Sequence, residues 1–153
     1  MGDVVLSVRG LSKVYRSGGR RVTALEDVSF DIRQGETLGL VGPSGSGKST
    51  LARVLMRLTE PDTGSVTLAG EDWLALSRGA LRRRRATAQM VFQDPLSAFN
   101  PRATIGGALA DPLRIHGIVG RSERPRRVGE LLERVGLPAD FARRRIHEVS
   151  GGQ

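Results

Sequence analysis

The sequence has 153 residues, 39% of them hydrophobic, which suits one domain or a piece of one with a globular core. It has no cysteine, which excludes disulfides, thiolate zinc sites and cysteine nucleophiles, and its formal net charge is +8. No signal peptide or apolar run of transmembrane length is recognisable, so we expect a soluble, cytosolic protein.

The first part of the chain indicates strands that lead into a glycine-rich loop. Residues 4–9 and 22–32 are rich in β-forming side chains and predict strands on either side of a turn at 16–20. The second of these signals is interrupted near residues 26–27. Residues 36–41 predict a short buried strand that ends where the glycines begin.

The loop after this expected strand has the pattern G-x-x-x-x-G-K-S, a phosphate-binding P-loop. Its glycines let the backbone curl so that successive N–H groups turn toward an anion. Lys48 would place a positive charge on the β- and γ-phosphates, and the Ser49 hydroxyl would bind Mg²⁺. The predicted polyphosphate site consists of Gly42, Pro43, Ser44, Gly45, Ser46, Gly47, Lys48, Ser49 and Thr50.

A helix is expected directly after the loop, where its positive N-terminal end would face the phosphates. Its apolar stripe, with helical spacing, consists of Leu51, Val54, Leu55 and Leu58. The alternative is an ordinary glycine-rich turn between a strand and a helix. That alternative explains neither Lys48 nor Ser49.

Further strand and helix signals follow in the next stretch. We predict a turn at 60–64, a strand at 65–68, and a helix over 77–85 with Ser77 as its N-cap. Residues 88–92 predict a second buried strand.

From residue 94 the pattern becomes helical. A loop at 94–102 precedes helices at 104–116 and 122–135. The apolar stripe of the second helix consists of Val128, Leu131, Leu132 and Val135. We therefore predict two domains, 1–93 and 94–153.

Two arginine runs, 82–85 and 143–145, carry much of the positive charge. They favour either nucleic-acid or anionic-membrane binding, or solvated helix faces with an acidic partner. We favour the second interpretation, because stacking aromatic side chains are not interleaved with the arginines.

Together with the P-loop, the segment Val149-Ser150-Gly151-Gly152-Gln153 resembles the Leu-Ser-Gly-Gly-Gln signature of the ATP-binding subunits of ABC transporters. Two further marks of that family are similar here: a glutamine at a strand end, Gln93, and an aromatic residue in the first strand region, Tyr15. Residues 93–102 resemble the corresponding segment of dipeptide and oligopeptide importers, with Phe99 where leucine is usual.

This resemblance implies an α/β fold: a P-loop NTPase core with a β-rich N-terminal flank and the start of a helical subdomain, truncated at the signature. It implies ATP and Mg²⁺ as cofactors. Tyr15 would stack on adenine, and Gln93 would contact Mg²⁺ and position the attacking water. The residues that would contact the nucleotide of a second subunit are Ser150, Gly151, Gly152 and Gln153.

The resemblance also implies a function and partners. The intact protein would be the ATP-hydrolysing subunit of an importer, for di- or oligopeptides. It would pair head to tail with a second ATPase subunit and act with two transmembrane permease subunits and, indirectly, a substrate-binding protein. It would lie on the cytoplasmic face of the membrane, without nucleic acid. The acidic pair that activates water in the family is not found here, so we identify no catalytic residue and expect this chain to bind ATP at most.

Two alternatives stay open at this point. One is a non-transporter ABC ATPase that acts on ribosomes or nucleic acid, which the arginine runs favour slightly. The other is a nucleotide-binding module without catalysis.

Overall fold

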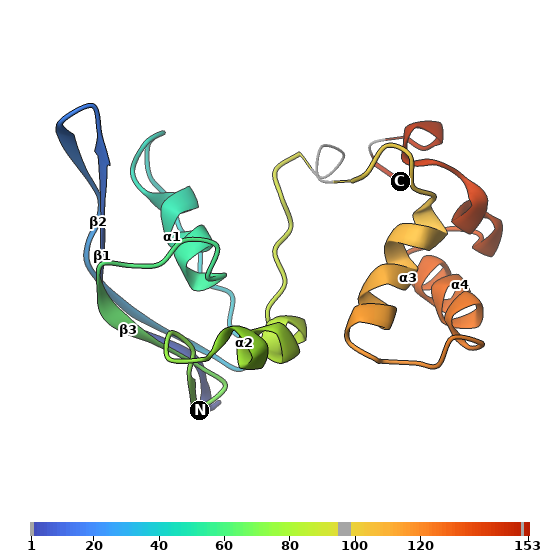
Figure 1. Ribbon diagram of the computed structural model, residues 1–153, viewed down its shortest axis with the longest axis horizontal. Coiled ribbons are helices and arrows are strands. Elements are labelled where there is room, and N and C mark those ends of the chain that lie inside the picture. Colours follow the sequence, from blue (N-terminus) through green and yellow to red (C-terminus); the bar gives the residue numbers. More distant parts are fainter. Residues whose placement is uncertain (1, 95–98, 151) are drawn as a thin grey trace. The chain divides into compact units, whose positions relative to one another are not determined.

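The computed structural model describes residues 2–94, 99–150 and 152–153 (Figure 1). By their contacts the residues divide into two units, Met1–Gln89 and Met90–Gln153. The predicted domain boundary between residues 93 and 94 stays a prediction. Part of the predicted loop at 94–102, residues 95–98, lies outside the described residues.

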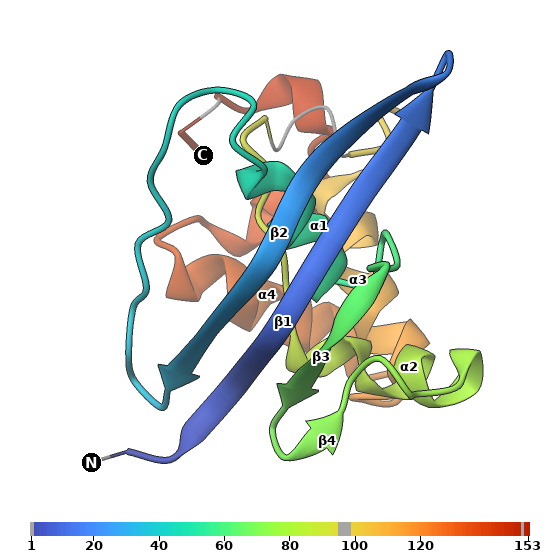
Figure 2. The same cartoon turned by 90° about the vertical axis from the view of Figure 1, so that its left-hand side faces the viewer.

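An antiparallel sheet is the frame of the first unit. Strands β1 (Val4–Ser17) and β2 (Arg20–Arg33) form a long hairpin. Strand β3 (Thr63–Leu68) pairs with the other edge of β1, and β4 (Glu71–Asp72) pairs with β3. The order across the sheet is β2-β1-β3-β4 (Figure 2). This confirms the predicted β-rich N-terminal flank.

The hairpin is longer than predicted, because β1 continues beyond residue 9 and stays paired with β2 to its end. The predicted interruption at 26–27 is a bulge inside β2. Leu11 pairs with Val28 and Lys13 with Leu25, so the bulged strand carries an extra residue. Asp27 there has a φ of 48°.

Helix α1 (Lys48–Leu55) covers one face of this sheet and closes the core of the first unit (Figure 2). Leu51 and Val54 of α1 are its buried residues, as the predicted stripe requires. They pack against buried side chains of the sheet and of the segment after it: Val8, Leu11, Leu25, Val66 and Trp73. Each such burial stabilises the unit by about 1.5–3 kcal/mol, so this packing holds α1 in place.

The prediction that α1 reaches Leu58 is wrong. The helix ends at Leu55, and Arg57 takes a left-handed φ of 47°. The N–H of Arg57 donates to the Val54 oxygen and the N–H of Leu58 to the Arg53 oxygen, each at 2.8 Å. These bonds close the last turn, and the Leu58 side chain is exposed.

The strands predicted at 36–41 and 88–92 are also wrong. Within the described residues neither segment pairs with a strand. Leu40 and Val41 are 53% and 92% exposed, and Val91 is 88% exposed. A strand needs neighbouring N–H and C=O groups as partners, and in the described residues these two segments are not paired with the sheet β2-β1-β3-β4.

Helix α2 (Arg78–Arg84) begins where the sequence predicts, and the short 3₁₀ helix η1 (Arg85–Thr87) follows it. The predicted N-cap is confirmed: the Ser77 hydroxyl accepts a hydrogen bond from the Ala80 N–H at 3.3 Å.

The second unit is helical, which confirms the predicted start of a helical subdomain. It contains α3 (Ile105–Ile115), α4 (Arg124–Arg134), and the 3₁₀ helices η3 (Ala139–Arg143) and η4 (Ile146–Glu148). Its buried core consists of Leu113, Val128, Leu132 and Phe141. Val135 of the predicted stripe lies beyond the end of α4 and is 71% exposed.

Candidate functional site

The glycine-rich loop precedes the N-terminus of α1, where the sequence predicts an anion site. Gly45 and Gly47 have left-handed φ values of 82° and 90°, which turn the loop back toward the helix. Gly47 is the N-cap of α1, and no side chain caps the helix there. The first turn of α1 also lacks an acidic side chain. The first N–H groups of α1 therefore stay available to an anion, with the helix dipole behind them.

Lys48 holds its ammonium group across this loop. Its Nζ donates to the carbonyl oxygens of Gly42 and Pro43, both at 2.7 Å, and to the Ser46 hydroxyl at 3.3 Å. These acceptors belong to the loop that the sequence predicts as the phosphate site. A polyphosphate that enters the loop would therefore meet both the charge and the backbone donors.

The loop packs closely against the sheet at Gly47. A Cβ atom on this residue would lie 2.2 Å from the Ala24 carbonyl oxygen and 3.2 Å from Leu25 Cδ2. Only glycine allows this approach of the loop to β2. The contact fixes where the phosphate end of the site lies relative to the β1–β2 hairpin.

The residues present fit a magnesium ion held jointly with a nucleotide. Ser49 stands beside Lys48 in the first turn of α1 and is exposed. A hydroxyl and phosphate oxygens are hard ligands of the kind Mg²⁺ takes. Across residues 2–94, 99–150 and 152–153, no group of three or more His, Cys, Asp or Glu residues is placed to hold a metal. A magnesium ion bound here would take the Ser49 hydroxyl together with phosphate oxygens of the nucleotide.

Tyr15 lies on β1, opposite Val22 of β2, and its side chain is 38% exposed. The Lys13 ammonium lies 5.8 Å from the centroid of the tyrosine ring. The ring lines a depression of about 700 Å³ together with Arg16, Arg21 and Thr59. The structure thus places the predicted stacking residue in the same unit as the P-loop, with its ring accessible.

Asp62 also lines this depression. From the sequence it was predicted only to be part of a turn, and not to be a site residue. Its carboxylate accepts from the Val14 N–H at 2.6 Å and from Lys13 Nζ at 3.1 Å. The hydrogen bond from Val14, followed by that from Lys13, lowers the pKa of the Asp62 carboxyl below its ordinary value. An aspartate next to the start of a predicted strand was the available signal, but its partners on β1 are distant in sequence.

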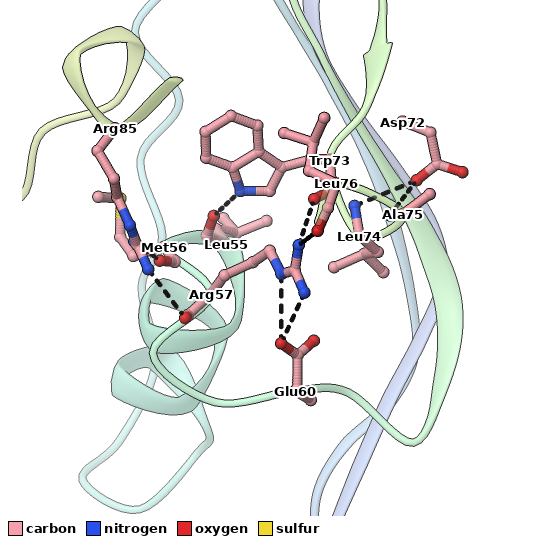
Figure 3. Close-up of polar contacts among 10 residues, drawn as sticks. All are labelled: Leu55, Met56, Arg57, Glu60, Asp72, Trp73, Leu74, Ala75, Leu76 and Arg85. Carbon is pink, nitrogen blue, oxygen red and sulfur yellow. Dashed lines mark hydrogen bonds and ion pairs between the residues drawn. The ribbon is translucent and has the colours of Figure 1, made fainter. Parts of the chain in front are cut away.

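The far end of α1 is anchored by arginines and a tryptophan (Figure 3). Trp73 Nε1 donates to the Leu55 oxygen at 2.9 Å, and the Arg85 guanidinium donates to the oxygens of Met56 and Arg57. Arg57 in turn donates to the oxygens of Trp73 and Leu76 and to Glu60. Positive charge at a helix C-terminus is favourable, so these contacts help hold α1 with its N-terminus toward the loop.

These contacts also bear on the first arginine run. Arg84 pairs with Glu71, and Arg85 binds the end of α1. In the other run, the Arg144 guanidinium lies 3.8 Å from the centroid of the Phe141 ring. At least these three arginines contact other groups of the chain, and the interpretation of the two runs stays a prediction.

The remaining predicted site residues belong to the second unit. Gln93 is exposed and does not end a strand, which corrects that part of the prediction. Ser150 and Gln153 close a turn: the Gln153 N–H donates to the Ser150 oxygen at 3.0 Å, and the Ser150 N–H donates to Gln153 Oε1 at 3.1 Å. Gly151 lies outside the described residues, and Gly152 is exposed.

A P-loop at the start of a helix, carried by an antiparallel sheet and followed by a helical unit, defines a P-loop protein of the nucleotide-binding class. The family model described as "ABC transporter" matches residues 25–153. The chain belongs to the ABC transporter family.

Several curated proteins are similar to this chain over nearly all of its length. A Brucella ovis protein provisionally named as a peptide import ATP-binding protein is 47% identical, over 97% of this chain and 47% of its own. The glutathione import ATP-binding protein GsiA of Escherichia coli O157:H7 is 48% identical, over 99% of this chain and 26% of its own. The chain therefore spans about half, or less, of the length of these relatives.

Solved structures agree with the fold. The ATP-binding cassette MJ0796, in a dimeric post-hydrolysis state bound to ADP and Pi, has a TM-score of 0.81 and 30% identity, over 97% of this chain and 64% of that one. The cbiO1 protein of Clostridium perfringens has a TM-score of 0.78 at 24% identity, over 99% of this chain and 57% of that one, and is similar in fold. The predicted α/β P-loop fold of an ABC ATPase is confirmed.

The helices in residues 2–94, 99–150 and 152–153 are short. None of the helices there combines the length and the apolar character needed to cross a bilayer.

Proposed function

We propose that this chain is the nucleotide-binding part of the ATPase subunit of an ABC importer for peptides. ATP would bind with its phosphates at the N-terminus of α1 and its adenine against Tyr15. Gln93 would contact Mg²⁺ and the attacking water, and Ser49 would hold Mg²⁺ together with the phosphates. When bound, the metal would neutralise phosphate charge and orient the terminal phosphate.

The observation that carries this proposal is the N-terminus of α1, which no side chain caps and which begins at Lys48, whose ammonium group contacts the loop. In the absence of a capping side chain, the helix N–H groups have no competitor for an anion. Lys48 bonds to the carbonyl oxygens of Gly42 and Pro43 and to the Ser46 hydroxyl, and none of these three groups carries a charge that would neutralise the ammonium. A polyphosphate satisfies both features at once.

The substrate and partners follow from the relatives. One is named for peptide import and one for import of glutathione, which is itself a tripeptide, so a short peptide is the proposed cargo. MJ0796 is dimeric with ADP and Pi. By analogy, the signature residues Ser150, Gly151, Gly152 and Gln153 would contact the nucleotide of a second subunit placed head to tail. Two permease subunits, with a substrate-binding protein outside, would place the complex on the cytoplasmic face of the membrane.

Calorimetry with MgATP tests the proposal. Lys48→Ala should weaken binding roughly ten- to hundredfold, because a charge-assisted contact is worth about 1.5–3 kcal/mol. Arg53→Ala is the matched control, since Arg53 is an exposed cation on the last turn of the same helix. It should bind MgATP as the wild type does. Equal MgATP affinity of Lys48→Ala and wild type would contradict the assignment of the phosphate site.

A further inference from the structure

The pairing of β1 with β3 stops at Ser12, before β1 reaches Tyr15. Ser12 pairs with Thr63, and β1 has no β3 partner beyond it. The Asp62 N–H donates to the Ser12 oxygen at 2.9 Å, which is the last backbone bond on this edge. The next N–H on the edge is that of Val14, and it donates to the Asp62 carboxylate at 2.6 Å instead of to a carbonyl. The aspartate side chain thus extends the ladder by one step, up to the residue before Tyr15.

The same carboxylate fixes a charge beside the tyrosine ring. Its other oxygen accepts from Lys13 Nζ at 3.1 Å. The Lys13 side chain is 15% exposed, against 46% for Asp62. This lysine lies 5.8 Å from the centroid of the Tyr15 ring. Asp62 therefore restrains both the backbone before Tyr15 and the cation next to its ring.

Asp62 stands at the end of the turn that leaves α1. At the start of that turn, Arg57 bonds to Glu60 at 2.9 Å and to the oxygens of Trp73 and Leu76 (Figure 3). The turn is thus anchored on the helix side by Arg57 and on the strand side by Asp62. The turn joins α1, which begins at the P-loop, to β3, and through Asp62 it also contacts β1, the strand that carries Tyr15.

We propose that Asp62 is a positioning residue for the nucleoside end of the site: through Val14 and Lys13 it sets the orientation of the Tyr15 ring against the base. This inference rests on the proposed function, because it takes the base to stack on Tyr15. It adds a residue that touches neither phosphate nor base. Because Asp62 acts through β1, its loss should weaken the binding of ligands that contain a base and should not weaken the binding of a bare phosphate chain.

Calorimetry with two ligands, ATP and inorganic triphosphate, is the first test. In the full chain, Asp62→Ala should weaken ATP binding about three- to tenfold, the range of a lost aromatic contact, and leave triphosphate unchanged. Asp62→Asn should recover part of the loss, because its amide oxygen still accepts from Val14. Glu60→Gln is the control, because it removes a carboxylate charge from the same turn at a residue that does not contact β1. It should preserve the ratio of the ATP affinity to the triphosphate affinity.

A Tyr15→Ala background separates positioning from general damage. Tyr15→Ala should itself weaken ATP, and adding Asp62→Ala should cause no further selective loss, because no ring remains to orient. Equal losses for both ligands, or additive losses in the double variant, would overturn the inference. Wild-type chain that binds neither ligand would instead overturn the proposed function.

A spectroscopic measurement keeps the inference testable without any nucleotide. Tyr15 is the only tyrosine in the sequence, so incorporation of 3-fluorotyrosine gives a single ¹⁹F signal. Asp62→Asn should shift or broaden this signal, and Glu60→Gln should not. An unchanged signal in Asp62→Asn, and in Asp62→Ala where it folds, would show that Asp62 does not orient the ring.

Discussion

Gly47 of the P-loop lies against Ala24 of β2, so closely that a Cβ on the glycine would stand 2.2 Å from the Ala24 oxygen. Ala24 sits between Thr23 and Leu25, whose partners on β1 are Val14 and Lys13. The P-loop therefore contacts the hairpin close to the point where β1 reaches Tyr15, the residue proposed to stack on adenine. This contact links the two ends of the candidate nucleotide site.

Gly47→Ala should damage the chain more than Gly45→Ala. Both residues have left-handed φ values, 90° and 82°, but no atom lies within 4 Å of a Cβ on Gly45. The backbone conformation alone costs about 1–3 kcal/mol, and the collision with Ala24 adds to it only at Gly47. Thermal melting of the two variants checks this. A Gly45→Ala variant as unstable as Gly47→Ala would mean that the contact with Ala24 is not what requires glycine.

Trp73→Phe should lower the free energy of unfolding by about 1–3 kcal/mol, because it leaves the Leu55 oxygen at the end of α1 without its indole donor. Trp73 is 1% exposed, so phenylalanine keeps most of the apolar packing but not the N–H. Urea denaturation measures the loss. Arg114→Gln, which removes an exposed ion pair with Asp111, is the control and should change stability by less than about 1 kcal/mol. Equal effects of the two variants would contradict the anchoring role.

Acid should reduce the stability that Asp62 contributes. Its folded pKa is lowered, first by the Val14 hydrogen bond and then by Lys13, with Arg16 also contributing. The contribution is therefore complete above the ordinary aspartate pKa of about 3.9 and is lost as the pH falls through the lowered folded value. The cations that face Asp62 are Lys13 and Arg16.

The difference in melting temperature between wild type and Asp62→Asn measures this. It should be constant above about pH 5 and shrink below that. The carboxyls of Asp31 and Glu130, which also have lowered pKa values, titrate in both proteins and cancel. A difference that does not vary with pH would show that the charge of Asp62 does not contribute.

Ser150→Arg in the full-length subunit should spare ATP binding by the monomer and abolish ATP-dependent dimerisation and hydrolysis. The added bulk and charge would stand where the γ-phosphate of the second subunit is proposed to lie. Size-exclusion chromatography with ATP and phosphate release measure the two effects.

Mixing Ser150→Arg with Lys48→Ala sharpens this prediction. Each mixed dimer would hold one composite site with both halves intact, so part of the hydrolysis should return. An ATP-bound structure with Ser150 against the phosphates of its own chain would contradict the arrangement.

The P-loop and most helices were predictable because their causes are local. Glycines at 42, 45 and 47 with Lys48 and Ser49 describe the loop within a few residues, and the apolar spacing of Leu51 and Val54 describes α1. Likewise, the N-cap at Ser77 depends on an N–H only a few residues away. The family could be recognised from the sequence for the same reason, since its marks are short motifs.

The features that could not be predicted from the sequence depend on contacts between residues that are far apart along the chain. Residues 36–41 and 88–92 have strand-like composition, but in the described chain neither has a neighbouring strand to bond with. Asp62 binds Val14 and Lys13, and Arg85 binds the end of α1, across separations that no local pattern records. The sequence alone determined which residues could hold a phosphate. The tertiary structure decided how the phosphate loop and the Tyr15 ring are held in one unit. They are held by the packing of α1 and the turn after it against the hairpin, and these contacts form between segments that are far apart in the sequence.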